Sequence, residues 1–144
     1  TINDRKKEMF QLSGGKYIAP QPLENKFKES QFIEQIMVVG ENEKFTAALV
    51  IPDFVFLHNL CTIHNVKFRD NDDLIEKQVV IDRYQKEIDK YNSSLGQVEK
   101  VKVFKLISDE WTPENGMLSP TQKLKRKKVK AKYISLLDKI YEKN

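Results

Sequence analysis

The chain has 144 residues, of which 40% are hydrophobic and 32% are charged, and it carries a formal net charge of +4. That length allows one domain with a hydrophobic core but excludes a large multidomain enzyme. No segment approaches the roughly 20 apolar residues of a membrane span, and none resembles a signal peptide. The lone Cys61 cannot form an internal disulfide, which indicates a reducing, cytoplasmic environment. Because the sequence begins at Thr1 rather than at Met, we expect a domain excised from a longer protein.

A β-hairpin is predicted near the N-terminus. Two short strands, Met9–Leu12 and Tyr17–Ala19, flank the sequence SGGK at 13–16, where paired glycines allow the positive φ of a tight turn. Residues 21–30 then read as a short helix with Pro22 near its first turn.

The clearest β pattern lies in the next third of the chain. The apolar runs IMVV at 36–39 and TAALVI at 46–51 are short enough for strands and apolar enough to be buried on both faces. The segment 53–65 is predicted to be a helix capped by Asp53, and 66–72 a polar connection.

The longest helix is predicted over 72–92. Its apolar residues fall on one face, and charged residues fill the opposite one. The members of the apolar face are Leu74, Ile81, Tyr84, Ile88 and Tyr91. Either Asp72 or Asp73 can cap the helix, and Gly96 lies just past its end.

The C-terminal part is predicted to contain a strand over 98–107, a turn-rich loop over 108–122, and a helix from near Lys125 to near Tyr141. The inner face of that helix comprises Val129, Tyr133, Leu136, Leu137 and Ile140. Grouped strands with helices between them indicate an α+β domain. We expect an N-terminal β-hairpin plus a small three-stranded sheet covered by helices.

The net charge is unevenly distributed. Residues 116–144 carry nine basic and two acidic side chains, a net charge of +7, so the preceding 115 residues carry −3. This asymmetry is consistent with an anionic partner for the C-terminal segment. It is equally consistent with the solvated face of a helix, which is the more common meaning of such a run.

Standard catalytic and metal-binding patterns are absent from the sequence. There is no Gly-x-Ser-x-Gly elbow and no Walker loop, because the Gly-Lys pair at 15–16 lacks the required loop and trailing Ser or Thr. His58 and His64 are six residues apart and do not stack on one helix face, so no metal site is expected. Two loops remain: the glycine turn, and a long loop that ends at Lys123. Each could also be an ordinary solvated loop.

The two loops, in this order, resemble motifs of the C-terminal domain of the adenylate-forming enzymes. The stretch NDRKKEMFQLSGGKYIAPQPLE resembles the hinge motif of that superfamily, and NGMLSPTQKLKRKKV resembles its catalytic-lysine motif. The resemblance runs from about residue 3 to about residue 141. The form of the second motif is most similar to the long-chain fatty-acid–CoA ligase branch.

This resemblance implies a two-step reaction. A fatty acid attacks the α-phosphate of Mg²⁺-ATP and gives acyl-adenylate and pyrophosphate, and CoA thiol then converts the adenylate into acyl-CoA and AMP. Residues 1–144 would form the C-terminal lid domain, with 1–7 as its hinge. A large N-terminal domain would hold most of the ATP, Mg²⁺ and acyl sites, so the isolated domain is expected to be inactive.

The resemblance also assigns roles to individual residues. Lys123 aligns with the catalytic lysine, whose ammonium would bridge carboxylate and phosphate oxygens during adenylation. Lys7 falls at the hinge position, where many relatives carry Asp, and Arg5 is a candidate nucleotide contact. The family usually has Gly before the catalytic lysine, whereas this chain has Gln122, and Lys125 is a rival for the catalytic position.

The glycine turn receives a role in the second step. Gly14 and Gly15 match the turn that lines the pantetheine tunnel for CoA, where small residues suit a narrow channel. Lys16 could meet CoA phosphates.

Two alternative functions remain open at this point. The chain could belong to the same superfamily but serve an aryl, amino or short-chain acid. It could instead be a basic nucleic-acid-binding module, although the sheet offers no aromatic ribonucleoprotein motif and the rest of the chain is acidic, so no nucleic-acid partner is expected. The lysines at 125–132 are predicted to be a solvated helix face that could also contact CoA or a membrane surface as a peripheral site.

Overall fold

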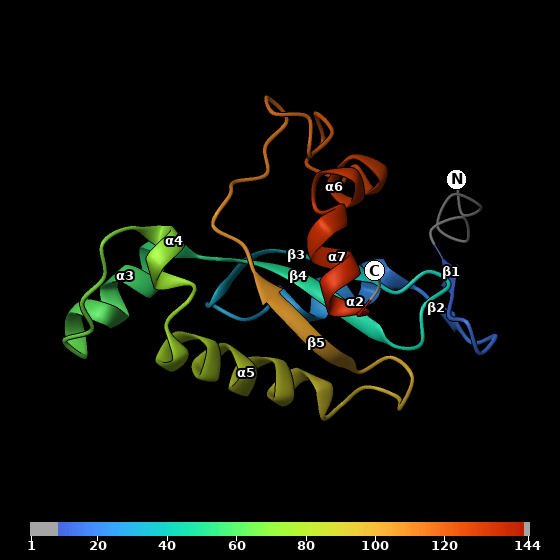
Figure 1. Ribbon diagram of the computed structural model, residues 1–144, viewed down its shortest axis with the longest axis horizontal. Helices are drawn as coiled ribbons and strands as arrows, with labels where there is room; N and C mark the ends of the chain where they lie inside the picture. Colours follow the sequence, from blue (N-terminus) through green and yellow to red (C-terminus); the bar gives the residue numbers. More distant parts are fainter. Residues whose placement is uncertain (1–8, 143–144) are drawn as a thin grey trace. The chain divides into compact units, whose positions relative to one another are not determined.

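The computed structural model describes residues 9–142, which form two compact units with their boundary after Ser108. Figure 1 shows the helices and strands coloured along the sequence, from blue near the N-terminus to red near the C-terminus. The first unit contains β1 (Phe10–Gln11), β2 (Tyr17–Ile18), α2 (Pro20–Phe27), β3 (Ile33–Val39), β4 (Thr46–Pro52), α3 (Phe54–Ile63), α4 (Asn71–Leu74), α5 (Gln78–Asn92) and β5 (Val101–Leu106). The second unit contains α6 (Arg126–Lys132) and α7 (Ile134–Ile140).

A mixed three-stranded sheet is the centre of the first unit, and β1 and β2 form a separate antiparallel hairpin. Strand β4 lies between β3, its antiparallel neighbour, and β5, which runs parallel to it. All seven residues of β4 are buried, as its uninterrupted apolar sequence predicts. The predicted α+β class, hairpin and small sheet are therefore confirmed.

Helix α5 packs its apolar face into the core of this unit. Tyr84 and Ile88 are fully buried there together with Phe27 of α2. The hydroxyl of Tyr84 donates a 2.6 Å hydrogen bond to the carbonyl of Phe32, and burial raises the pKa of this hydroxyl well above its ordinary value. Asp53 caps α3 as predicted, because its Oδ1 accepts the N–H of Phe56 at 3.1 Å.

The predicted single helix over 72–92 is wrong, because the chain breaks it into α4 and α5. Asp70, rather than Asp72 or Asp73, caps α4 by accepting the N–H of Asp73 at 2.8 Å. The break shifts the phase of the apolar face, so Val80 is buried in α5.

One charged residue of α5 also lies inside rather than outside. Glu87 is buried, and its carboxylate accepts hydrogen bonds from Ser30 Oγ at 2.6 Å and Arg83 Nη1 at 3.1 Å. These partners satisfy a charge that would otherwise be costly to bury.

The predicted last helix is divided at Tyr133, where φ −108° and ψ 25° leave the helical region. Helix α7 starts at the next residue. The apolar residues therefore keep their helical spacing across the break, and the sequence pattern does not reveal it. Of the predicted inner face, Val129, Leu137 and Ile140 are buried.

Candidate functional site

The glycine turn of the β1–β2 hairpin is a three-residue loop closed by two backbone hydrogen bonds. The N–H of Gly15 donates to the carbonyl of Leu12 at 2.9 Å, and the N–H of Leu12 donates to the carbonyl of Lys16 at 2.8 Å. Gly15 has φ +95°, which is the left-handed region that this kind of turn requires. The side-chain Nε2 of Gln11 donates to the carbonyl of Gly15 at 3.1 Å and braces the tip.

The hairpin is anchored to the turn between β3 and β4. The N–H of Ser13 donates to the carbonyl of Glu43 at 2.9 Å, and the N–H of Asn42 donates to the carbonyl of Gln11 at 2.8 Å. Gly40 lies at this contact, with φ +153°, and a Cβ on it would meet a carbon of Phe10 at 3.1 Å and the carbonyl oxygen of Phe45 at 3.1 Å. The close approach therefore requires glycine.

The tip of the hairpin is open to solvent. Gly14, Gly15 and Lys16 are all exposed, and a Cβ on Gly14 would meet no atom within 4 Å. The structure thus brings the three candidate CoA-binding residues together in one turn. The candidate hinge residue Lys7 and the candidate nucleotide contact Arg5 lie outside the described residues.

Lys123 ends a second turn with the same hydrogen-bond pattern. The N–H of Gln122 donates to the carbonyl of Ser119 at 2.8 Å, and the N–H of Ser119 donates to the carbonyl of Lys123 at 2.7 Å. On either side, Leu118 and Leu124 pair as an antiparallel bridge. Ser119 Oγ accepts the N–H of Lys123 at 3.1 Å, so the backbone of this lysine is held on both sides.

Gln122 occupies the left-handed position of this turn, with φ +69°. It stands where the resemblance places a glycine, and the conformation explains that preference. A residue with a Cβ is strained in this region by roughly 1–2 kcal/mol.

The side chains of Lys123 and Lys125 are both exposed. Within residues 9–142, neither Nζ takes part in a hydrogen bond or ion pair. Their backbones differ, because Lys123 belongs to the turn whereas Lys125 is the N-cap residue of α6. The turn offers a braced backbone with an ammonium group available to a ligand, which is the arrangement that a phosphate or carboxylate contact needs.

A preceding turn supports the lysine turn. The Oδ1 of Asn115 accepts the N–H groups of Thr112 and Met117, both at 3.1 Å, and its Nδ2 donates to the carbonyl of Glu110 at 2.8 Å. Met117 in turn accepts the N–H of Lys125 at its carbonyl, 2.9 Å away.

Comparison with known proteins decides the family. The family model described as AMP-binding enzyme C-terminal domain matches residues 7–144. The chain belongs to this family.

Curated relatives with similar sequences are long-chain acyl-CoA synthetases. The chain is 33% identical to long-chain-fatty-acid–CoA ligase 1 of Homo sapiens and 30% identical to long chain acyl-CoA synthetase 8 of Arabidopsis thaliana, in each case over 97% of this chain and 20% of the relative. It therefore spans about a fifth of the length of these relatives.

Solved structures with a similar fold include adenylation domains of carboxylic acid reductases. One is the A-PCP didomain of carboxylic acid reductase from Segniliparus rugosus in complex with AMP, with a TM-score of 0.74, 26% identity, and coverage of 95% of this chain and 18% of that one. Another is the adenylation domain of the carboxylate reductase from Mycobacterium chelonae, with a TM-score of 0.72, 27% identity, and coverage of 96% and 20%.

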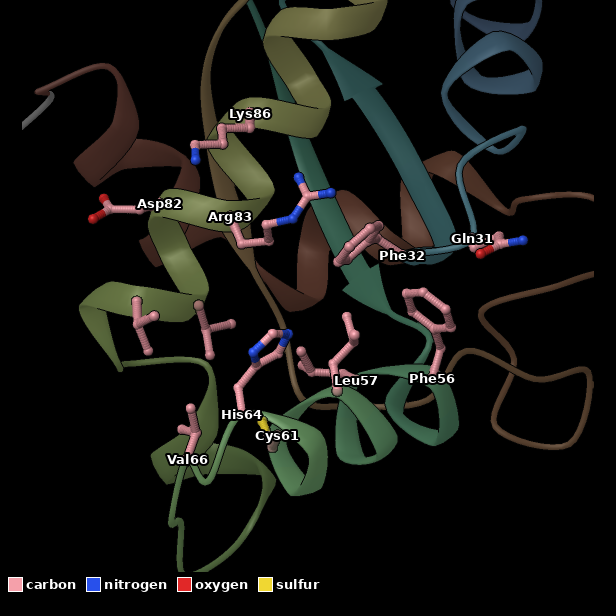
Figure 2. Close-up of a pocket in the computed structure, with 13 residues that line it drawn as sticks. Gln31, Phe32, Phe56, Leu57, Cys61, His64, Val66, Asp82, Arg83 and Lys86 are labelled. Carbon is pink, nitrogen blue, oxygen red and sulfur yellow. The ribbon is translucent and has the colours of Figure 1, made fainter.

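A pocket of about 940 Å³ also lies in this AMP-binding enzyme C-terminal domain, between α3 and α5. Figure 2 shows Phe32, Phe56 and Leu57 around it, with the guanidinium of Arg83 directed over the ring of Phe32, 4.3 Å from its centroid. Cys61 lies in its wall, and burial raises the pKa of this thiol. None of its lining residues belongs to either quoted motif.

The described residues contain neither a helix that could span a membrane nor a cluster of metal-ligating side chains. Over residues 9–142, no helix is both long enough and apolar enough to cross a bilayer. In the same range, no group of three or more His, Cys, Asp and Glu side chains is arranged to hold a metal ion.

Proposed function

We propose that this domain is the catalytic lid of a long-chain fatty-acid–CoA ligase, which activates a fatty acid with ATP to acyl-AMP and transfers the acyl group to CoA. The observation that carries the proposal is the turn at 119–123. Its two-sided backbone bonding fixes Lys123, while its ammonium is exposed and has no partner among the described residues. The similarity to long-chain acyl-CoA synthetases supports the choice of acid.

In the adenylation step, Lys123 is the catalytic residue. Its ammonium contacts the fatty-acid carboxylate and the α-phosphate of ATP, where negative charge accumulates as the new P–O bond forms. A compact cation held by a braced backbone stabilises that charge without reorganising at the moment of reaction. Lys125, which occupies the N-cap position of α6, is the rival for this role.

In the thioester-forming step, the β1–β2 hairpin replaces the lysine turn at the reaction centre. Gly14 and Gly15 leave room at the exposed tip for the pantetheine arm of CoA, and Lys16 contacts its phosphates. Lys7 absorbs the backbone rotation between the two steps, and Arg5 contacts the nucleotide.

The partners of the domain follow from this division of labour. The remaining part of the ligase holds most of the ATP, Mg²⁺ and acyl sites, because the chain spans only about a fifth of its relatives. The lysines of α6 form a basic face that could approach an anionic membrane surface on which fatty acids are supplied. We place the enzyme in the cytoplasm, with this peripheral contact.

The test uses the complete gene product and measures the two half-reactions separately. Palmitate-dependent pyrophosphate release reports adenylation, and thioester formation from preformed palmitoyl-adenylate reports the second step. Lys123→Ala should lose adenylation and keep thioester formation, and Lys125→Ala is the matched control. If only Lys125→Ala loses adenylation, Lys125 is the catalytic lysine; if the wild type releases no pyrophosphate with any fatty acid, the long-chain proposal is wrong.

A second candidate keeps the adenylation chemistry and changes the acid. The similarity of the fold to adenylation domains of carboxylic acid reductases, at TM-scores of 0.72 and 0.74, favours it. A panel of aryl, amino and short-chain acids in the pyrophosphate assay separates the two candidates.

A further inference from the structure

A hydrogen-bonded cluster joins the two ends of the segment that carries Lys123. The indole Nε1 of Trp111 donates to the hydroxyl oxygen of Tyr133 at 3.0 Å, and that hydroxyl donates to Oδ2 of Asp109 at 2.7 Å. Trp111 is buried, and its ring centroid lies 6.1 Å from that of Tyr133. The Tyr133 hydroxyl thus uses its donor and one acceptor position within this cluster.

Backbone hydrogen bonds connect the cluster to the lysine turn from both sides. On the N-terminal side, Thr112 follows Trp111 and accepts the N–H of Leu118, whose bridge partner Leu124 is adjacent to Lys123. On the C-terminal side, α6 links Lys125 to Tyr133 through the N–H of Val129, which donates to the carbonyl of Lys125, and the N–H of Tyr133, which donates to the carbonyl of Val129. Residues 109–133 therefore form a loop, and the hydrogen bonds of the Tyr133 hydroxyl join its two ends.

We propose that Tyr133 is a positioning residue for Lys123, and that its hydroxyl fixes the lysine turn by tying Asp109 and Trp111 to the junction of α6 and α7. The inference rests on the proposed role of Lys123 in adenylation. It assigns Tyr133 no contact with substrate.

The protonation state of Tyr133 allows its hydroxyl to keep this hydrogen bond to Asp109. Burial raises the pKa of Tyr133 well above its ordinary value, so the hydroxyl keeps its proton and donates throughout the neutral range. The ammonium of Lys132 lies 3.7 Å from the same Asp109 oxygen, but both side chains are partly exposed, so this ion pair contributes little. The hydroxyl bonds, rather than the charge, hold the two ends of the loop together.

The first test applies Tyr133→Phe to the complete gene product and measures both half-reactions. A catalytic group displaced by about 1 Å can lose up to about 100-fold in rate. We expect that loss in adenylation, with thioester formation from preformed adenylate within about twofold of wild type. A purely structural role would lower both half-reactions equally, and that outcome, or an unchanged adenylation rate, would overturn the inference.

Two further variants isolate the hydrogen bond. Asp109→Asn keeps an oxygen acceptor for Tyr133 and should stay within about threefold of wild-type adenylation, whereas Asp109→Ala should resemble Tyr133→Phe. The matched control is Tyr91→Phe, because within residues 9–142 the Tyr91 hydroxyl makes no hydrogen bond. An Asp109→Asn enzyme as impaired as Asp109→Ala would show that charge matters and the proposed tie is wrong.

Lys123→Ala in the same assays separates failure of this inference from failure of the proposed function. If Lys123→Ala keeps wild-type adenylation, the proposed function is wrong and the inference falls with it. If Lys123→Ala loses adenylation while Tyr133→Phe keeps it, only the inference is overturned.

Amide hydrogen exchange of the 144-residue chain gives a readout independent of activity. Tyr133→Phe should speed exchange at Leu118 and Lys125 by about tenfold and leave Leu49 of β4 unchanged. Equal exchange in both proteins at Leu118 and Lys125 would contradict the proposed tie.

Discussion

The glycine turn at 12–16 and the lysine turn at 119–123 have the same backbone design. In both, the fourth residue is left-handed and donates its N–H to the carbonyl of the first, and the first donates to the carbonyl of the fifth, which is a lysine. They differ in the left-handed residue, which is Gly15 in one and Gln122 in the other. They also differ in what braces them.

The backbone of the glycine turn is hydrogen-bonded to a segment distant in sequence, whereas the backbone next to the lysine turn is hydrogen-bonded within its own loop. Glu43, Asn42 and Gly40 hold the first turn from the β3–β4 connection. Next to the second turn, Asn115 accepts the N–H of Met117, whose carbonyl accepts the N–H of Lys125 just past the turn. A locally braced turn can keep its geometry when the rest of a domain moves, which suits the role proposed for Lys123.

The largest expected effect distinguishes Lys123 of the lysine turn from Lys16 of the glycine turn. In the complete gene product, Lys123→Ala should lower adenylation by about 100- to 1,000-fold, the usual consequence of removing one preorganised group that stabilises developing charge. Lys16→Ala should leave adenylation unchanged and raise the KM for CoA by up to about fivefold, as expected for one exposed ionic contact. Measuring both half-reactions for both variants checks the pair. A loss of adenylation in Lys16→Ala would show that the turns are not functionally distinct.

The next effect tests the distant bracing of the glycine turn. Gly40→Ala should destabilise the chain by about 2–4 kcal/mol, because the new Cβ meets Phe10 and the carbonyl of Phe45 at 3.1 Å in a backbone conformation that favours glycine. Urea unfolding followed by circular dichroism measures it. Gly14→Ala is the control, since its Cβ would meet no atom within 4 Å. Equal losses in the two variants would argue against the close contact.

A smaller effect tests the local bracing of the lysine turn. Asn115→Ala removes three hydrogen bonds of 2.8–3.1 Å to the backbone and should cost about 1–2 kcal/mol. The fluorescence of Trp111, the single tryptophan, follows unfolding of the second unit directly. Glu114→Ala, at an exposed neighbouring position, should be nearly neutral. If both variants unfold at the wild-type urea concentration, Asn115 does not brace the turn.

The last pair of variants tests the left-handed residue of each turn, where the expected changes in stability have opposite signs. Gln122→Gly should stabilise the chain by up to about 1 kcal/mol by relieving left-handed strain, and Gly15→Ala should destabilise it by about 1–2 kcal/mol. Thermal unfolding of the two variants beside the wild type measures both. A destabilising Gln122→Gly would mean that the Gln side chain contributes more than its strain costs.

The sequence predicts the strands and the glycine turn well, because their signals are local. Apolar runs identify β3 and β4, and the paired glycines at 14–15 mark a hairpin. The lysine turn is different, because Gln122 carries no composition signal for a left-handed residue. Only a resemblance that places glycine there suggests the conformation.

The errors in the helices have two causes, one local and one between distant segments. Asp70, rather than Asp72 or Asp73, caps α4. The three aspartates lie so close together in the sequence that only the geometry of their side chains shows which one is the cap. Glu87 is charged and yet buried. Its partner Ser30 lies more than fifty positions away, so the sequence alone does not identify the contact. The cluster of Asp109, Trp111 and Tyr133 escaped prediction for the same reason.

The central position of β4 has a consequence for biosynthesis. Its parallel partner β5 is reached only after the chain has passed through α3, α4 and α5, so one edge of β4 stays unpaired until Val101–Leu106 emerge from the ribosome. That edge belongs to an uncharged, β-branched-rich strand, the kind that recruits other chains. Products truncated between β4 and β5 should therefore aggregate and be degraded, and limited proteolysis in the 93–100 connection should matter little once β5 has paired.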